Sequence, residues 1–244
     1  MNVRFPIGSA LLSAAILTAS NATATTLELE YQSETSAFYD VNDENALLVV
    51  TDYLVGEAAG NGTPVNGAAV GAYRIKADLM GVATDFLAFC LEPLTNFVLP
   101  ATYERINKFG EDVTTQLNML AENAFELVQT HETAAAFQMA AWEIATEDLA
   151  PFNLGNGNFQ ITGDSTASNL AEGIAQDWLD NITNATWGDP TSSYMILSAD
   201  GNQDLLTNVA VSTVPLPTSG LMMATVALGA GALATRRRRV QNSK

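Results

Sequence analysis

Residues 134–144, which read AAAFQMAAWEI, form the stretch on which the fold depends most. Apolar side chains occupy nearly every position, so a helix built from this stretch is apolar around its whole circumference. Such a helix must be buried on most sides, and it therefore lies between other elements of a domain. The surrounding sequence predicts that the helix runs from His131 to Glu147.

Gln138 lies in the middle of this apolar helix. A buried amide that lacks hydrogen-bond partners costs about 1 to 3 kcal/mol. The sequence therefore predicts that the Gln138 side chain either finds several partners in the core or undergoes a reaction that removes its amide.

Two further helices are expected beside the central one. Apolar residues recur at helical spacing from Glu111 to about Thr130, and again from Ser165 or Thr166 to Leu179. Alternating or continuous apolar runs predict strands over residues 26–31, 46–50, 72–76, 84–91, 159–162, 194–197 and 205–211. Residues 46–78 are expected to form a hairpin with a long loop. This order predicts an α+β fold, in which an antiparallel β-sheet or sandwich packs against a small helical subdomain.

The amino-terminal segment is typical of an export signal. Arg4 precedes an apolar run over residues 10–17, and the small residues Ala22-Thr23-Ala24 follow it. We expect residues 1–24 to form a secretory signal helix that is removed, and residues 25–212 to form the ectodomain.

The carboxy-terminal segment predicts a membrane helix. Val214-Pro215-Leu216-Pro217 precedes an apolar stretch over residues 219–234, and the cluster Arg236-Arg237-Arg238-Arg239 follows it. The stretch is short for a spanning helix, which needs roughly 17 to 25 residues, but a basic cluster behind it fits the positive-inside rule. An ordinary single-span anchor is one interpretation of this segment.

Residues 213–244 also resemble a bacterial sorting tail of the PEP-CTERM type, in its VPLPA variant. Val214, Pro215, Leu216 and Pro217 stand in the motif positions, whereas Thr218 replaces the usual alanine. The resemblance implies a precursor held transiently in the inner membrane by a transmembrane helix. An exosortase-like processing enzyme would then remove the tail on the way to the cell surface or the extracellular matrix.

The ectodomain is strongly acidic. It contains all 27 acidic residues of the chain and four basic ones, Arg74, Lys76, Arg105 and Lys108, which gives a net charge of −23. This charge argues against binding to nucleic acid and to anionic lipid. At roughly 190 residues, the region is long enough for one domain with a substantial core.

Cys90 is the only cysteine of a chain that carries export signals, so it has no partner for an intramolecular disulfide. It lies in AFCLEPLTNF, residues 88–97, where a strand is expected to end before Pro93. If the fold brings the Cys90 sulfur to the side-chain carbonyl of Gln138, attack by the thiolate expels ammonia and leaves an internal thioester. Apolar neighbours would keep water out of such a site. These neighbours are Phe86, Phe89, Phe137, Met139 and Trp142.

These two blocks resemble the thioester domain of bacterial surface adhesins. Phe89, Cys90 and Leu91 match the cysteine block of that family. Gln138, Ala140, Trp142, Glu143 and Ile144 match its glutamine block, in which Phe137 replaces the threonine that often precedes the glutamine. The resemblance implies covalent capture of amine or hydroxyl groups on surface or matrix targets, with Gln138 as acyl donor and Cys90 as leaving group. It implies adhesion rather than an enzyme, and it requires no cofactor.

Other interpretations remain open for the same residues. A free cysteine is often a small buried apolar residue, and a buried glutamine can bond to backbone groups, which would leave a non-covalent structural protein of the matrix. His131, the only histidine, lies two turns before Gln138 on the same helix face, so a Cys-His hydrolase is geometrically conceivable. His131 is also a candidate for tuning aminolysis of a thioester.

Metal binding is not expected. Residues 40–45 begin like a calcium loop, but Asn45 stands where the loop requires glycine and Thr51 where it requires glutamate. We interpret this segment as an acidic, solvated turn.

Overall fold

The computed structural model describes residues 26–31, 48–56, 62–79, 82–106, 108–147 and 150–211. The expected signal helix over residues 1–24, the sorting tail over residues 213–244 and the acidic turn over residues 40–45 therefore lie outside the described residues. Within the described residues, no helix is both long enough and apolar enough to span a bilayer.

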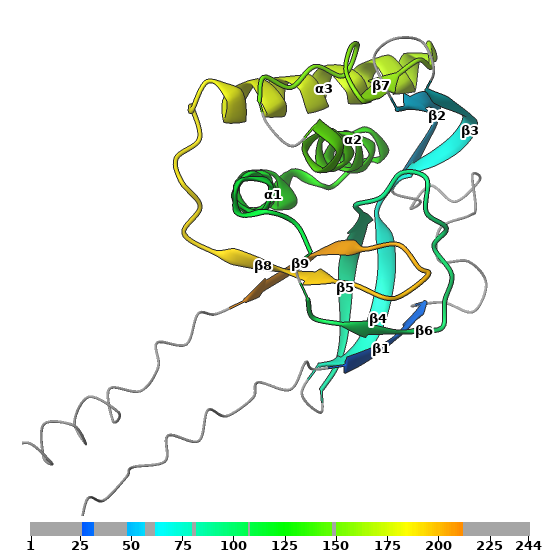
Figure 1. Cartoon of the computed structure of the whole chain (residues 1–244), viewed down its shortest axis with the longest axis vertical. Helices are drawn as coiled ribbons and strands as arrows, with labels where there is room; N and C mark the ends of the chain where they lie inside the picture. Colours follow the sequence, from blue (N-terminus) through cyan, green and yellow to red (C-terminus); the bar gives the residue numbers. More distant parts are fainter. Residues whose placement is uncertain are drawn as a thin grey trace, which may run out of the picture.

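Six antiparallel strands form the larger sheet. They are β1 (Thr26–Tyr31), β4 (Tyr73–Leu79), β5 (Val82–Cys90), β6 (Ala101–Glu104), β8 (Ser193–Leu197) and β9 (Leu205–Val211), in the spatial order β6-β1-β4-β5-β9-β8. Glu104 and Ser198 exchange two backbone hydrogen bonds of 2.8 Å, which join the ends of β6 and β8. The sheet therefore curls until its two outer strands meet. It lies below the helices in the view of Figure 1.

A smaller antiparallel sheet contains three strands. Its order is β3-β2-β7, with β2 at Leu48–Val55, β3 at Thr63–Gly71 and β7 at Phe159–Ile161. The expected hairpin over residues 46–78 is therefore wrong, because β2 pairs with β3 and β4 belongs to the larger sheet. The residues of β3 include Pro64, Asn66 and Gly67, which are typical of turns, and an edge strand tolerates such residues.

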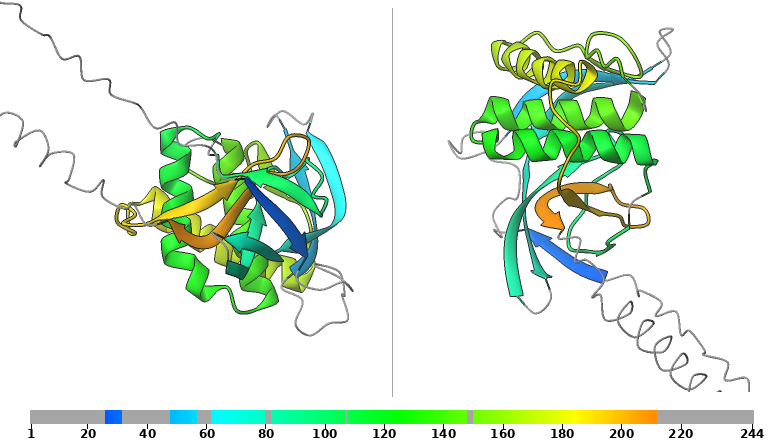
Figure 2. Two further views of the ribbon diagram at one scale, coloured as in Figure 1. Left: turned by 90° about the horizontal axis from the view of Figure 1, so that it is seen from below. Right: turned by 90° about the vertical axis from the view of Figure 1, so that its left-hand side faces the viewer.

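Three helices lie together above the larger sheet. They are α1 (Glu111–Ala124), α2 (His131–Glu147) and α3 (Thr166–Thr183), and a short 3-10 turn, η1 (Phe125–Leu127), follows α1. The views in Figures 1 and 2 show α1 and α2 next to the larger sheet and α3 farther from it, with β2 and β3 beside the helices. The antiparallel sheets and the small helical layer that the sequence predicts are therefore present.

The central helix α2 is buried along most of its length, as its apolar circumference predicts. Every side chain from Ala134 to Ile144 is buried. Five of the side chains in this stretch are alanines with no exposed surface, namely Ala134, Ala135, Ala136, Ala140 and Ala141. Because alanine side chains are short, other elements can approach the α2 backbone closely on several sides.

An aromatic cluster joins the larger sheet to the helices. The ring of Phe137 on α2 stacks on Phe125 at 4.5 Å between centroids and lies 4.3 Å from Phe89 on β5. Phe125 also meets the ring of Tyr194 on β8, edge to face, at 5.0 Å. Pairs of this kind contribute about 0.5 to 1.5 kcal/mol each beyond the area that they bury. The cluster therefore holds α2 at a defined position on the sheet.

Candidate thioester site

The side-chain amide of Gln138 meets the backbone of Cys90. The Cys90 backbone N–H donates to Gln138 Oε1 at 2.8 Å, and Gln138 Nε2 donates to the Cys90 carbonyl oxygen at 2.5 Å. Gln138 is 1 % exposed and Cys90 2 % exposed, so both hydrogen bonds lie inside the core. The polar side chain that the sequence places in an apolar helix thus has its partners on β5.

The strand pairing explains why the Cys90 backbone is available to a side chain. Leu91 N–H bonds to the Asp204 carbonyl toward β9, so in an antiparallel strand the N–H and C=O of Cys90 point to the opposite edge, toward β4. There β4 begins at Tyr73, which pairs with Ala88, and the preceding chain belongs to β3 in the other sheet. The Gln138 amide takes the place of a missing strand partner.

The aromatic residues that precede Cys90 and Gln138 hold the two segments in register. Phe89 and Phe137 have no exposed surface, and their ring centroids lie 4.3 Å apart. Because each ring is adjacent in sequence to a residue of the pair, this contact fixes the height of α2 along β5. Phe137, which stands where the adhesin family often has threonine, thus has a packing role here.

Two tyrosines border the thiol of Cys90. The Tyr73 side chain hydrogen-bonds to the thiol, and Tyr53 is close enough for a Cys90 thiolate to act on its titration. Burial raises the pKa of the Cys90 thiol far above its usual range, the Tyr73 hydrogen bond lowers it, and the Glu92 carboxylate raises it. Burial also raises the pKa of Tyr53 to about 12, and the charge of a Cys90 thiolate adds to that rise. Wherever Cys90 is not bonded to Gln138, its thiol is therefore protonated at neutral pH.

The other predicted neighbours are buried in the same hydrophobic core as Cys90. Met139 has no exposed surface, Phe86 is 6 % exposed, and Trp142 is 5 % exposed. The Trp142 ring lies 5.1 Å from the Tyr53 ring, whose hydroxyl donates to the Pro93 carbonyl oxygen at 2.7 Å. The Tyr53 and Trp142 rings therefore form an apolar surface beside the end of β5.

Glu143 is a second polar side chain in the buried part of α2. It has no exposed surface, its Oε1 accepts from Asn153 N–H at 2.6 Å, and its Oε2 has no partner. Burial raises the pKa of this carboxyl to about 7, the Asn153 hydrogen bond lowers it, and the nearby Glu147 raises it. Apart from its match to the glutamine block, nothing in the sequence marks Glu143 as part of a site.

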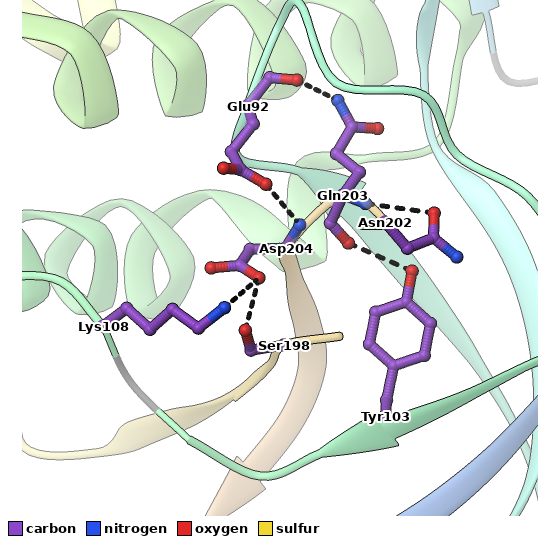
Figure 3. A network of polar contacts seen from close by, with 7 residues as sticks. All are labelled: Glu92, Tyr103, Lys108, Ser198, Asn202, Gln203 and Asp204. Atoms are coloured by element: carbon purple, nitrogen blue, oxygen red, sulfur yellow. Dashed lines mark hydrogen bonds and ion pairs between the residues drawn. The ribbon is translucent and has the colours of Figure 1, made fainter. Parts of the chain in front are cut away.

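A polar network anchors the segment that follows Cys90 (Figure 3). The Glu92 carboxylate accepts from Asp204 N–H at 3.0 Å, and Gln203 Nε2 donates to the Glu92 carbonyl oxygen. Asp204 Oδ1 accepts from Ser198 Oγ at 2.6 Å and lies 3.6 Å from Lys108 Nζ. The network ties the end of β5 to the start of β9 and the end of β8.

A pocket of about 380 Å³ opens beside this anchored segment. Leu91, Glu92 and Pro93, which directly follow Cys90, line one side, and Ala145 and Thr146 of α2 line another. The pocket therefore lies beside this end of β5.

Other predicted site residues lie elsewhere. His131 is half-buried at the first position of α2, two turns before Gln138, and the side chain that bonds to the Cys90 thiol is Tyr73. The sorting-motif residues, Val214–Pro217 and Arg236–Arg239, lie outside the described residues. Among the residues that the structure describes, no group of three His, Cys, Asp or Glu side chains is placed to hold a metal ion.

No protein-family model matches the chain, and no curated protein matches it. Solved structures similar to it include the N-terminal thioester domain of fibronectin-binding protein SfbI from Streptococcus pyogenes, with 13% identity over 72% of this chain and 99% of that chain and a TM-score of 0.40. The N-terminal thioester domain of a surface protein from Clostridium perfringens matches with 14% identity over 66% of this chain and 100% of that chain, at a TM-score of 0.37.

The N-terminal domain of the Streptococcus pyogenes pilus tip adhesin Cpa matches with 12% identity over 66% of this chain and 95% of that chain, also at a TM-score of 0.37. These structural neighbours are thus domains of bacterial surface proteins, two of them thioester domains. At these TM-scores the likeness decides neither the site nor the function of this chain.

Proposed function

We propose that this chain is an exported surface protein whose ectodomain carries an internal thioester between Cys90 and Gln138 and couples covalently to amine or hydroxyl groups. The observation that supports the proposal is the contact between the Gln138 amide and Cys90 inside a buried site. Because these hydrogen bonds bring the Gln138 amide to the residue that bears the only thiol, an intramolecular reaction between the two side chains is favoured.

The hydrogen bonds of the site favour formation of the bond. Attack of Cys90 Sγ on Gln138 Cδ places negative charge on Oε1, which the Cys90 N–H already contacts at 2.8 Å. The C–N bond then breaks, and Nε2 leaves as ammonia after taking up the proton that the thiol loses. Because the proton of the thiol ends on the leaving nitrogen, the step needs no external base.

The thioester is then an activated acyl group. A target amine attacks Gln138 Cδ, the C–S bond breaks, and the acyl group passes to the target nitrogen while the Cys90 thiol re-forms. Each molecule reacts once, so the protein is an adhesin rather than an enzyme. The pocket lined by Leu91–Pro93, Ala145 and Thr146 is the route by which we expect the target to approach.

Export and sorting form the second part of the proposal. The segments over residues 1–24 and 213–244 would take the precursor through the inner membrane, where an exosortase-like enzyme removes the tail. The acidic ectodomain, which has a net charge of −23 from 27 acidic and four basic residues, would then lie on the cell surface or in the matrix.

A non-covalent matrix protein is the second candidate, and one observation favours it. Both ends of the Gln138 amide are already bonded to the Cys90 backbone, so the amide can serve as a purely structural link. In that case the thiol remains free and the domain acts as a scaffold.

Treatment with methylamine distinguishes the two candidates. The covalent candidate predicts that methylamine is incorporated at Gln138 and that one thiol is released, with neither event in the Cys90→Ala variant. Peptide mapping by mass spectrometry locates the modification. Protein that takes up no methylamine and has its thiol free before treatment would support the scaffold instead.

A further inference from the structure

The Tyr73 hydroxyl lies at the candidate thioester site of Cys90 and Gln138. Tyr73 pairs with Ala88 across β4 and β5, and Cys90 lies two residues beyond Ala88 on the same strand face. Tyr73 and Cys90 are therefore diagonal neighbours, a distance that an aromatic side chain spans. The hydroxyl makes a hydrogen bond with the Cys90 thiol.

The position of the Tyr73 ring is fixed by packing. Its centroid lies 4.2 Å from that of Phe97 in an edge-to-face arrangement. The ring is half-buried, so its hydroxyl reaches the sulfur from the rim of the buried site. A fixed donor at a reacting atom is worth more than a mobile one, because it does not have to reorganise during the reaction.

Displacement of Cys90 from the proposed thioester is helped by a hydrogen-bond donor at the sulfur. When a nucleophile displaces Cys90, the electron pair of the C–S bond moves to the sulfur. Burial raises the pKa of the Cys90 thiol, so a bare thiolate is a poor leaving group in this site. A hydrogen-bond donor at the sulfur stabilises the thiolate as it forms.

We infer that Tyr73 is a catalytic residue of the thioester reaction, donating a hydrogen bond to Cys90 Sγ as the sulfur departs from Gln138. This inference rests on the proposed function. In the balanced step, the target nitrogen forms a bond to Gln138 Cδ, the C–S bond breaks, and the nitrogen loses one proton. That proton ends on Cys90 Sγ, and the Tyr73 hydroxyl donates a hydrogen bond to the sulfur until it arrives.

Tyr53 supplies a matched comparison, because it is a second phenol near the same sulfur. Its hydroxyl proton is committed to the Pro93 carbonyl oxygen at 2.7 Å. Removing that hydroxyl loosens the segment after Cys90 but takes no donor from the sulfur.

The test compares Tyr73→Phe with Tyr53→Phe in the purified protein. Each variant retains its ring, so Tyr73→Phe keeps the edge-to-face contact with Phe97. Thiol release by methylamine is followed over time, with each sample denatured before the thiol is labelled so that burial of Cys90 does not limit the reading. We expect release to be roughly 100-fold slower in Tyr73→Phe and to change less than about threefold in Tyr53→Phe. Melting curves recorded beside the rates identify any variant that fails to fold.

The outcomes separate the inference from the proposed function. Wild-type protein that releases a thiol, together with Tyr73→Phe that releases it at the same rate, overturns the inference and leaves the thioester in place. Equal slowing in both variants also overturns it, because the cause is then loosening of the site. Wild-type protein that has a free thiol from the outset overturns the proposed function, and the role of Tyr73 with it.

Discussion

Gln138 and Glu143 are two polar side chains in the same buried helix, little more than one turn apart, but they differ in how many hydrogen-bond partners the core provides. Both ends of the Gln138 amide are bonded to the Cys90 backbone. Glu143 has one oxygen on Asn153 N–H, whereas its other oxygen is buried without a partner. Neither residue is more than 1 % exposed.

The difference lies in what each side chain faces. Gln138 faces the end of β5, where the N–H and C=O of one residue lack a strand partner and match the donor and acceptor of an amide. Glu143 faces the loop before β7, where one N–H is offered to two carboxyl oxygens. The Gln138 position therefore offers one donor and one acceptor, which suits an amide, whereas the Glu143 position favours a protonated carboxyl.

Gln138→Ala should have the largest effect on stability. It leaves the N–H and C=O of Cys90 buried and unpaired, which costs roughly 2 to 6 kcal/mol, and it removes any thioester link as well. Urea unfolding measures the loss. Gln129→Ala on the exposed surface is the control and should change stability by less than about 0.5 kcal/mol. Equal stability of both variants would show that the amide has no structural role.

Cys90→Ala sharpens the same comparison, because it keeps both hydrogen bonds of Gln138. If a thioester links residues 90 and 138 in the wild-type protein, its loss costs about 4 kcal/mol in the chain-entropy model. Loss of the thiol alone costs only about 1 kcal/mol. Urea unfolding of this variant therefore reports the covalent link, and a loss of only about 1 kcal/mol would count against it.

Glu143→Gln tests the other side of the comparison through pH. The pKa of Glu143 is raised to about 7 in the fold, so the folded protein binds this proton more tightly than the unfolded chain does. Protonation of Glu143 therefore contributes to the free energy of unfolding, and this contribution is fully present below about pH 4.5. It is lost as the pH rises to about 7 and is absent above that. The total loss of stability is at most about 3 kcal/mol. Unfolding at pH 5 and pH 8 measures it.

The variant should therefore flatten the pH dependence and be more stable than wild type at pH 8. Glu126→Gln, which removes an exposed carboxylate, is the control and should leave the pH dependence nearly unchanged. If the free energy of unfolding depends on pH in the same way in wild type and in Glu143→Gln, the fold does not raise the pKa of Glu143.

Lys108→Met should have the smallest effect. Lys108 Nζ lies 3.6 Å from Asp204 Oδ1, but its side chain is 51% exposed, and exposed ion pairs contribute less than about 1 kcal/mol. Unfolding in low and high salt measures this contribution. A loss comparable to that of Gln138→Ala would mean that the network around Asp204, rather than the Gln138 contact, holds the end of β5.

Several features of the fold were predictable because they follow from local pattern. The bounds of α2 at His131 and Glu147 follow from its apolar run, and the end of β5 at Cys90 follows from Pro93 shortly after it. The anomaly of a glutamine within that apolar run was also sufficient to single out Gln138.

Features that depend on pairing between distant segments were not predictable. The turn-forming residues of β3 hide a strand, and closure of the sheet depends on a single bridge between Glu104 and Ser198. Tyr73 becomes part of the site only through its register with Ala88, which one sequence does not disclose. The sequence pattern singled out the two residues of the proposed thioester, whereas identifying their neighbours required the fold.

The intact mass of the untreated protein shows whether Cys90 and Gln138 are joined by a thioester. The mass of wild type is compared with those of Cys90→Ala and Gln138→Ala, prepared in the same way and corrected for the substitution. If the thioester is present, wild type is lighter by one ammonia, denaturation without added nucleophile reveals no thiol, and both variants have their full mass. Wild-type protein at full mass, with one thiol that can be labelled after denaturation, would contradict it.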